Sequence, residues 1–144
     1  MAVAGLEPLE NVTLTGFYDD AAIPTWCKGY VSSALKAGAI RGSTDPSGQP
    51  VFGAQDVVTL GEATVMLNSL LNISDVSAAA CFSAGEGHWA SQAAAHLAAS
   101  GVMRPESAGT PDMSAQMTRA EAAELLDGAL DVLAARDDGG WFPL

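Results

Sequence analysis

The chain contains two copies of one pattern, and this internal repeat limits the folds open to it. Trp26 precedes Gly38 by the same interval that separates Trp89 from Gly101. After a polar stretch, each copy continues with Thr-x-x-Glu and apolar residues at helical spacing. The two copies are offset by roughly sixty residues, a length typical of one supersecondary unit in a repeat protein. Each copy is therefore interpreted as helix, long loop, helix.

The first helix of each copy has recognisable ends. Pro24 suits the opening turn of a helix because proline has no N–H to leave unpaired, and Gly38 suits its C-terminal stop. This helix is expected to present four residues on one side: Trp26, Tyr30, Ala34 and Leu35. The corresponding helix of the second copy is expected over about 88–100, ending before Gly101.

The second helix of each copy is expected to begin with a capping box. In Thr59-x-x-Glu62 and Thr118-x-x-Glu121 the hydroxyl and the carboxylate satisfy two backbone N–H groups that a helix start leaves free. Leucine-rich stripes follow both boxes. Helices over 59–72 and 118–135 are predicted to pack against each other through these stripes. Between the helices of the first copy, residues 45–48 (Asp-Pro-Ser-Gly) are typical of a turn.

Composition limits the partners and the environment. Only 6% of residues are aromatic and alanine is abundant, which favours an all-α fold. The net charge of −11 argues against binding to nucleic acid or to anionic lipid. No segment reaches the ~18 consecutive apolar residues that membrane insertion requires. Residues 1–9 lack the basic start of a signal peptide, so any export signal is expected outside this sequence, which we interpret as a fragment of a longer chain.

The polar residues form no recognisable catalytic or cofactor-binding motif. There is no nucleophile elbow, phosphate loop or dinucleotide fingerprint, so the chain is not expected to be an enzyme or to need a cofactor. Asp19 and Asp20 lack the spacing of a calcium loop, and no metal site is expected. Cys27 and Cys81 are too far apart for a zinc or redox pair; either a disulfide between them or two small buried thiols fits the sequence.

Taken together, the motifs of both copies resemble the S-layer homology domain. The residues that carry the resemblance are Phe17-Tyr18-Asp19, Trp26, Gly38, Gly42, Gly48 and Phe52 in the first copy, and His88-Trp89-Ala90 with Met117-Thr118-Arg119-Ala120-Glu121 in the second. The first copy departs from the pattern, because Leu60 stands where the family has arginine. The second copy lacks a clear aromatic-x-Asp opening and has Pro105-Glu106 where the family has a glycine turn.

The resemblance implies an architecture. Family members commonly join three such repeats in a pseudo-threefold spindle around a central helix bundle. On this basis residues 17–73 and 82–136 are the two repeats, 74–81 a linker and 137–144 a tail, while 1–16 is an extension interpreted as the possible end of a preceding repeat. Contact with a missing third repeat, or self-association, would cover the side of the bundle that two repeats leave open.

The resemblance also implies a function. The family is non-catalytic and anchors extracellular proteins of the bacterial cell wall and S-layer to polysaccharide attached to peptidoglycan, which is often pyruvylated. A pyruvate carboxylate needs a fixed cation, backbone donors and a flat apolar surface for the sugar ring. The candidate glycan-binding residues are Arg119, Thr118, Glu121, Trp89, Trp26, Asp19 and Gly42.

Competing interpretations exist for several of these residues. Helix capping is the favoured role for both Thr-x-x-Glu pairs, and burial in the core is favoured for Trp26 and Trp89. Arg119 is as well suited to pairing with an acidic neighbour as to contacting a ligand. The alternative function is a protein-interaction or spacer module that keeps the fold without binding glycan.

Overall fold

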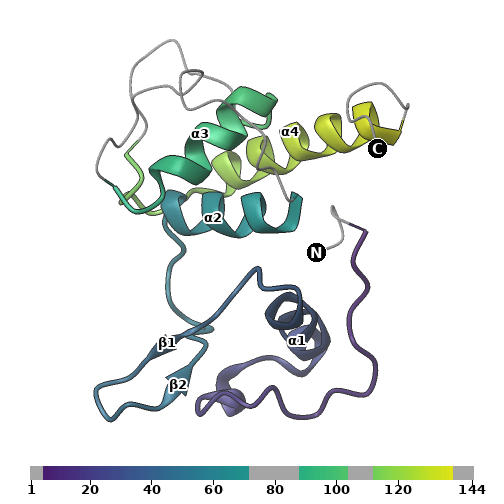
Figure 1. Cartoon of the computed structure of the whole chain (residues 1–144). Coiled ribbons are helices and arrows are strands. Elements are labelled where there is room, and N and C mark those ends of the chain that lie inside the picture. The colour runs from purple at the N-terminus through teal and green to yellow at the C-terminus, as the bar shows by residue number, and fades with distance from the viewer. Residues whose placement is uncertain (1–4, 72–87, 104–111, 138–144) are drawn as a thin grey trace. The chain divides into compact units, whose positions relative to one another are not determined.

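The computed structural model describes residues 5–71, 88–103 and 112–137 (Figure 1). The chain divides into two compact units, Met1–Val57 and Val58–Leu144. The described part is mostly helical, with one small antiparallel sheet of two strands, which confirms the all-α expectation at the level of fold class. No helix in the described ranges combines the length and apolar character of a membrane span.

The first unit contains the short sheet and one α-helix. Its elements are η2 (Asp20–Ala22), η3 (Thr25–Cys27), α1 (Lys28–Lys36), β1 (Ser43–Thr44) and β2 (Pro50–Val51). The expected helix start after Pro24 is confirmed, although its first turn is the 3-10 helix η3. Gly38 follows α1 with a positive φ of 74°, as expected for the residue that ends a helix. The predicted turn is also present: the Ser47 N–H donates to Asp45 Oδ1 at 2.8 Å.

The core of the first unit is built without its tryptophan. Phe17, Ile23 and Val31 are buried, and Phe52 packs against them with its ring centroid 5.7 Å from that of Phe17. Trp26, by contrast, is 78% exposed. Core burial of Trp26, the favoured interpretation, is therefore wrong.

The register of α1 explains this error. The residues that α1 turns inward are Lys28, Val31 and Ala34, at the i, i+3 spacing of one helix face. Trp26 belongs to the preceding 3-10 turn and falls outside this face. Tyr30 and Leu35, placed with Trp26 on the expected apolar side, are exposed as well.

The N-terminal extension runs along α1 without forming a helix over residues 5–16. The Leu9 N–H donates to the Gly29 carbonyl at 3.1 Å, and the Ser33 hydroxyl donates to the Glu7 carbonyl at 2.8 Å. The buried Lys28 ammonium pairs with Asp20 and also donates to the Thr13 carbonyl at 3.2 Å. The extension is therefore held to the helix that follows it.

Acid should weaken this arrangement at a defined pH. Hydrogen bonding to Lys28, and then to Thr15, lowers the pKa of Asp20 from 3.8 to about 2. Because the folded-state pKa lies below the unfolded value, the stabilisation is complete above pH 3.8 and is lost as the pH falls through about 2. Thermal melting between pH 5 and pH 2 should show this loss, and Asp20→Asn should flatten the dependence. Asp56→Asn, which removes an exposed carboxylate, is the control; an equal flattening there would contradict the assignment to Asp20.

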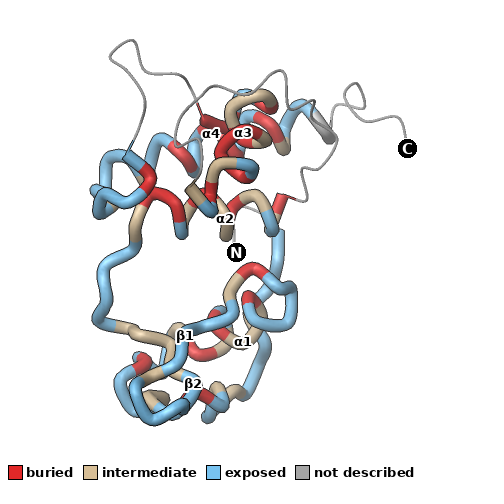
Figure 2. Tube along the Cα trace, turned by 60° about the vertical axis from the view of Figure 1, so that its left-hand side comes forward, coloured by how far each residue is buried: buried red, intermediate tan, exposed pale blue. Residues whose placement is uncertain are grey.

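The described residues of the second unit form the helices α2 (Leu60–Leu71), α3 (Ser91–Ser100) and α4 (Arg119–Asp137). Gly101 ends α3 in the left-handed conformation, with φ 88°, as predicted. Helix α2 packs against α3, and Figure 2 shows the buried stretches of both helices in red. Leu67 and Leu71 of α2 and Leu97 of α3 belong to this core.

Helix α4 is partly buried, with Leu125, Ala129 and Val132 in the core. The packing of α4 against α2 through their leucine stripes stays a prediction. Gly128 of α4 lies against the backbone of Val102, just after α3. Only part of the leucine stripe is buried, since Leu126 and Leu130 remain 43% and 50% exposed.

Candidate functional site

The starts of α2 and α4 are joined by a short backbone bridge. Thr59 and Gln116 form an isolated antiparallel β-bridge. On either side of it, the Met117 N–H donates to the Val58 carbonyl at 2.8 Å and the Leu60 N–H donates to the Ala115 carbonyl at 3.0 Å. The first turns of both helices therefore meet at one place in the second unit.

Both capping boxes are formed, as the sequence predicted. The Glu62 N–H donates to the Thr59 hydroxyl at 3.2 Å, and the Thr59 N–H donates back to the Glu62 carboxylate at 2.9 Å. The second box repeats this exchange: the Thr118 N–H donates to the Glu121 carboxylate at 2.7 Å, and the Glu121 N–H donates to the Thr118 hydroxyl at 3.2 Å. The Thr118 hydroxyl also donates to Glu121 at 2.9 Å. The backbone N–H of Thr118, and then its hydroxyl, lower the pKa of the Glu121 carboxyl.

These contacts favour a structural role for Thr118. Thr118→Ala should lower the free energy of unfolding by about 1 kcal/mol, the usual cost of losing an N-cap side chain. Urea unfolding followed by circular dichroism measures this loss. Thr25→Ala is a matched control, since no side-chain hydrogen bond is found for Thr25 within the described residues. Equal stability of the Thr118→Ala variant and the control would show that the box contributes nothing.

Arg119, the first residue of α4, is exposed. Its guanidinium makes no ion pair or hydrogen bond with any residue of the described part of the chain, which leaves this group open to a ligand. Its position at the helix start places it beside N–H groups that point away from the helix.

The two repeats differ sharply at this position. Leu60, which corresponds to Arg119 in the first copy, is buried. The next residue, Gly61, donates its N–H to the Met113 carbonyl at 2.8 Å, and a Cβ there would lie 3.0 Å from His88. The start of α2 is thus packed inside the unit, and an arginine in place of Leu60 would bury an unpaired charge.

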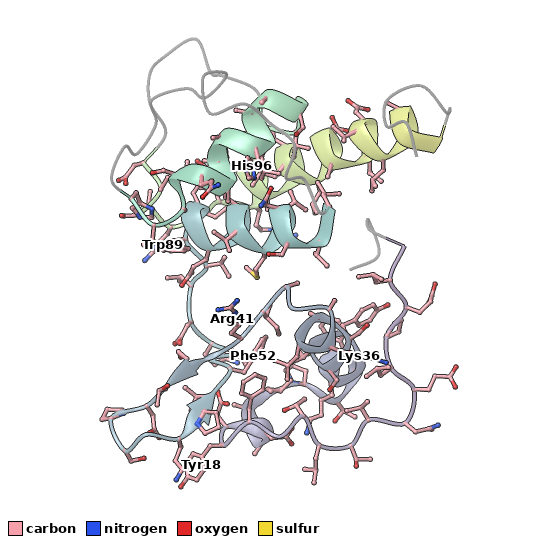
Figure 3. The ribbon with its side chains drawn as sticks, viewed as in Figure 1. Tyr18, Lys36, Arg41, Phe52, Trp89 and His96 are labelled. Atoms are coloured by element: carbon pink, nitrogen blue, oxygen red, sulfur yellow. The ribbon has the colours of Figure 1, made fainter. Side chains whose placement is uncertain are left out.

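Trp89 lies just before α3 (Figure 3) and is 64% exposed, so its predicted burial in the core is also wrong. Its ring packs beside that of His88, with centroids 5.1 Å apart and planes inclined at 33°. His88 and Ala90 lie against Gly61 at the start of α2. An exposed indole of this kind offers a flat apolar surface to a sugar ring.

His88 also connects this turn to the bridge. The Ala90 N–H donates to His88 Nδ1 at 3.1 Å, so Nδ1 is the acceptor and the proton of the neutral ring is on Nε2. Nε2 lies 3.3 Å from the Ser114 hydroxyl oxygen and donates to it. In this tautomer Nε2 is the donor and the Ser114 oxygen is the acceptor.

The remaining candidates lie in the first unit, and their contacts are structural. The Asp19 carboxylate accepts from the N–H groups of Phe52 and Gly53, at 2.8 Å each. The bond from Phe52 is the largest cause of the lowered pKa of Asp19. Gly42 has φ 73°, and a Cβ there would overlap the Phe17 ring. Of the three candidates in this unit, Trp26 and Gly42 are exposed and Asp19 is half-buried.

The predicted site therefore comes together only in part. Trp89, Thr118, Arg119 and Glu121 belong to the second unit, around the Thr59–Gln116 bridge. Sequence reasoning missed His88 as a bonding partner, and it missed Ser114 altogether. Their contact spans 26 residues of sequence, so only the fold brings them together.

Possible metal ligands and one of the two cysteines lie among the described residues. No cluster of three or more His, Cys, Asp or Glu side chains suited to a metal ion occurs within residues 5–71, 88–103 and 112–137. The Cys27 thiol donates to the Pro24 carbonyl at 3.2 Å. Cys81 lies outside the described residues, and with it the predicted alternative of a disulfide to Cys27.

Comparison of the chain with protein families, curated proteins and solved structures gives no match.

Proposed function

We propose that this chain is a non-catalytic anchoring module that binds acidic polysaccharide attached to peptidoglycan, outside a bacterial cell. The proposal rests on one observation above the others: Arg119 is exposed and free of described ion pairs at the start of a capped helix. In a chain of net charge −11, an acidic glycan must be met by a local positive group.

The geometry adds a second contact for the same ligand. The bridge extends from the Val58–Met117 pair, next to Arg119, to Gly61 and Met113, next to His88 and Trp89. We infer that one sugar carries the carboxylate to Arg119 and that a neighbouring ring lies on Trp89.

We further propose that the two repeats belong to an S-layer homology spindle. The formed capping boxes and the glycine-terminated helices support this, since they match the motifs that carry the resemblance. The partly exposed stripe of Leu126 and Leu130 on α4 suits contact with a third repeat or with a second copy.

One competing function has specific support. The buried Leu60 leaves the first copy without a cation, and the Thr118 and Glu121 side chains satisfy each other. These observations favour a spacer or protein-interaction module that has kept the repeat and lost the glycan site.

Sedimentation with purified cell-wall sacculi separates the two functions. The anchoring module should sediment with intact sacculi and remain in solution when the secondary polysaccharide has been extracted. A chain that stays in solution with both preparations is better explained as a spacer.

A further inference from the structure

His88 lies beside Trp89 and contacts several other described residues of the second unit. Its Nδ1 accepts from the Ala90 N–H at 3.1 Å, its Nε2 faces the Ser114 hydroxyl at 3.3 Å, and its ring packs beside Trp89. On the α2 side, Gly61 has no side chain, and a Cβ there would lie 3.0 Å from the imidazole. The imidazole is therefore fixed from four directions, whereas Trp89 itself is 64% exposed.

We propose that His88 is the positioning residue for a sugar-stacking surface formed by Trp89. This inference rests on the proposed glycan-binding function and identifies the part of the site that takes a pyranose ring. An indole exposed to this degree is free to change rotamer unless one face is held. The His88 ring supplies that contact, and its two nitrogens prevent the ring itself from turning.

Ser114 completes the surface with a polar group. Its oxygen accepts the His88 Nε2–H, and its own O–H proton remains available as a donor. The Ser114 N–H is bonded to Asp112 Oδ1 at 3.0 Å, which fixes the backbone of this residue. A sugar ring stacked on Trp89 would therefore have a hydroxyl donor at its edge, a combination that suits an uncharged pyranose.

Two substitutions separate positioning from bulk. His88→Phe keeps an aromatic ring beside Trp89, whereas His88→Leu keeps a similar volume and no ring. The probe is sacculus-attached polysaccharide. We expect His88→Leu to weaken binding by roughly two- to tenfold, the range of one aromatic pair contact, and His88→Phe to recover part of the affinity. Tyr18→Ala removes an exposed aromatic side chain of the first unit as the control and should bind as the parent does.

A second measurement tests the positioning directly, without any glycan. With Trp26 and Trp141 replaced by phenylalanine, Trp89 is the last of the three tryptophans. Fluorescence anisotropy and iodide quenching then report its mobility. His88→Leu should lower the anisotropy and change the quenching, and His88→Phe should move both back toward the parental values.

The outcomes distinguish this inference from the proposed function. Unchanged Trp89 fluorescence in His88→Leu, or a Phe variant as defective as the Leu variant, would overturn the positioning role even where Arg119 proves essential. If the parent protein does not bind sacculi at all, the proposed function is overturned. The fluorescence measurement would still decide whether His88 holds Trp89.

Discussion

Gly128→Ala should destabilise the second unit, although alanine is the better helix former. Glycine inside a helix normally costs about 1 kcal/mol relative to alanine, so propensity alone predicts a gain. Here a Cβ would overlap the Val102 carbonyl oxygen and lie 2.9 Å from the carbonyl carbon and 3.1 Å from Cα of the same residue. These are backbone atoms, which cannot rotate away as a side chain would.

The steric clash with Val102 should outweigh the gain in helix propensity, so Gly128→Ala should lower stability. Overpacking a tight contact costs about 1–3 kcal/mol, and α4 must move away from Val102 to make room. Urea unfolding followed by far-UV circular dichroism should therefore show a net loss for Gly128→Ala. Ala123→Gly, at an exposed position of the same helix, is the control and should lose about 1 kcal/mol from propensity alone. A more stable Gly128→Ala variant would mean that α4 does not approach Val102 as closely as described.

The elements that the sequence predicts best are those defined by local chemistry. A capping box involves residues three positions apart, and both boxes form as expected. Gly38 and Gly101 follow their helices with positive φ for an equally local reason. Because these interactions depend on few neighbours, no knowledge of the tertiary fold is needed to predict them.

Burial was harder to predict because it depends on the tertiary fold. Trp26 and Trp89 were expected inside because tryptophan has the largest apolar surface, yet both are exposed. The 3-10 turn before α1 sets a helical phase that turns Lys28 inward instead, where Asp20 neutralises its charge. A pattern of apolar residues does not reveal this phase.

In the candidate site, too, the sequence predicts the local motif but not the contacts that the tertiary fold makes. Arg119 could be identified from its motif, whereas the role of His88 depends on Ser114, which comes from a distant part of the sequence. The repeat itself suggested that positions 60 and 119 are equivalent. The fold makes one of them core and the other surface, because the start of α2 packs against His88 and Ala90 and Arg119 remains in solvent.

Arg119→Ala should reduce binding to polysaccharide-bearing sacculi by roughly 10- to 150-fold. This range corresponds to about 1.5–3 kcal/mol, the contribution of a hydrogen bond to a charged group. The fold should be unaffected, because Arg119 is exposed and has no described partner to lose. Arg119→Lys should give an intermediate loss, since lysine keeps the charge but not the planar pair of donors that matches a carboxylate.

The control for charge is Arg41→Ala. Arg41 is also exposed and has no described ion pair, but it belongs to the first unit. Both variants change the net charge equally, so a general effect of charge on an acidic polymer would weaken both alike. Loss confined to Arg119→Ala would place the anion at the start of α4. If Arg119→Ala binds sacculi as well as the parent does, the carboxylate is held elsewhere or nowhere, and the spacer function becomes the better explanation of this fold.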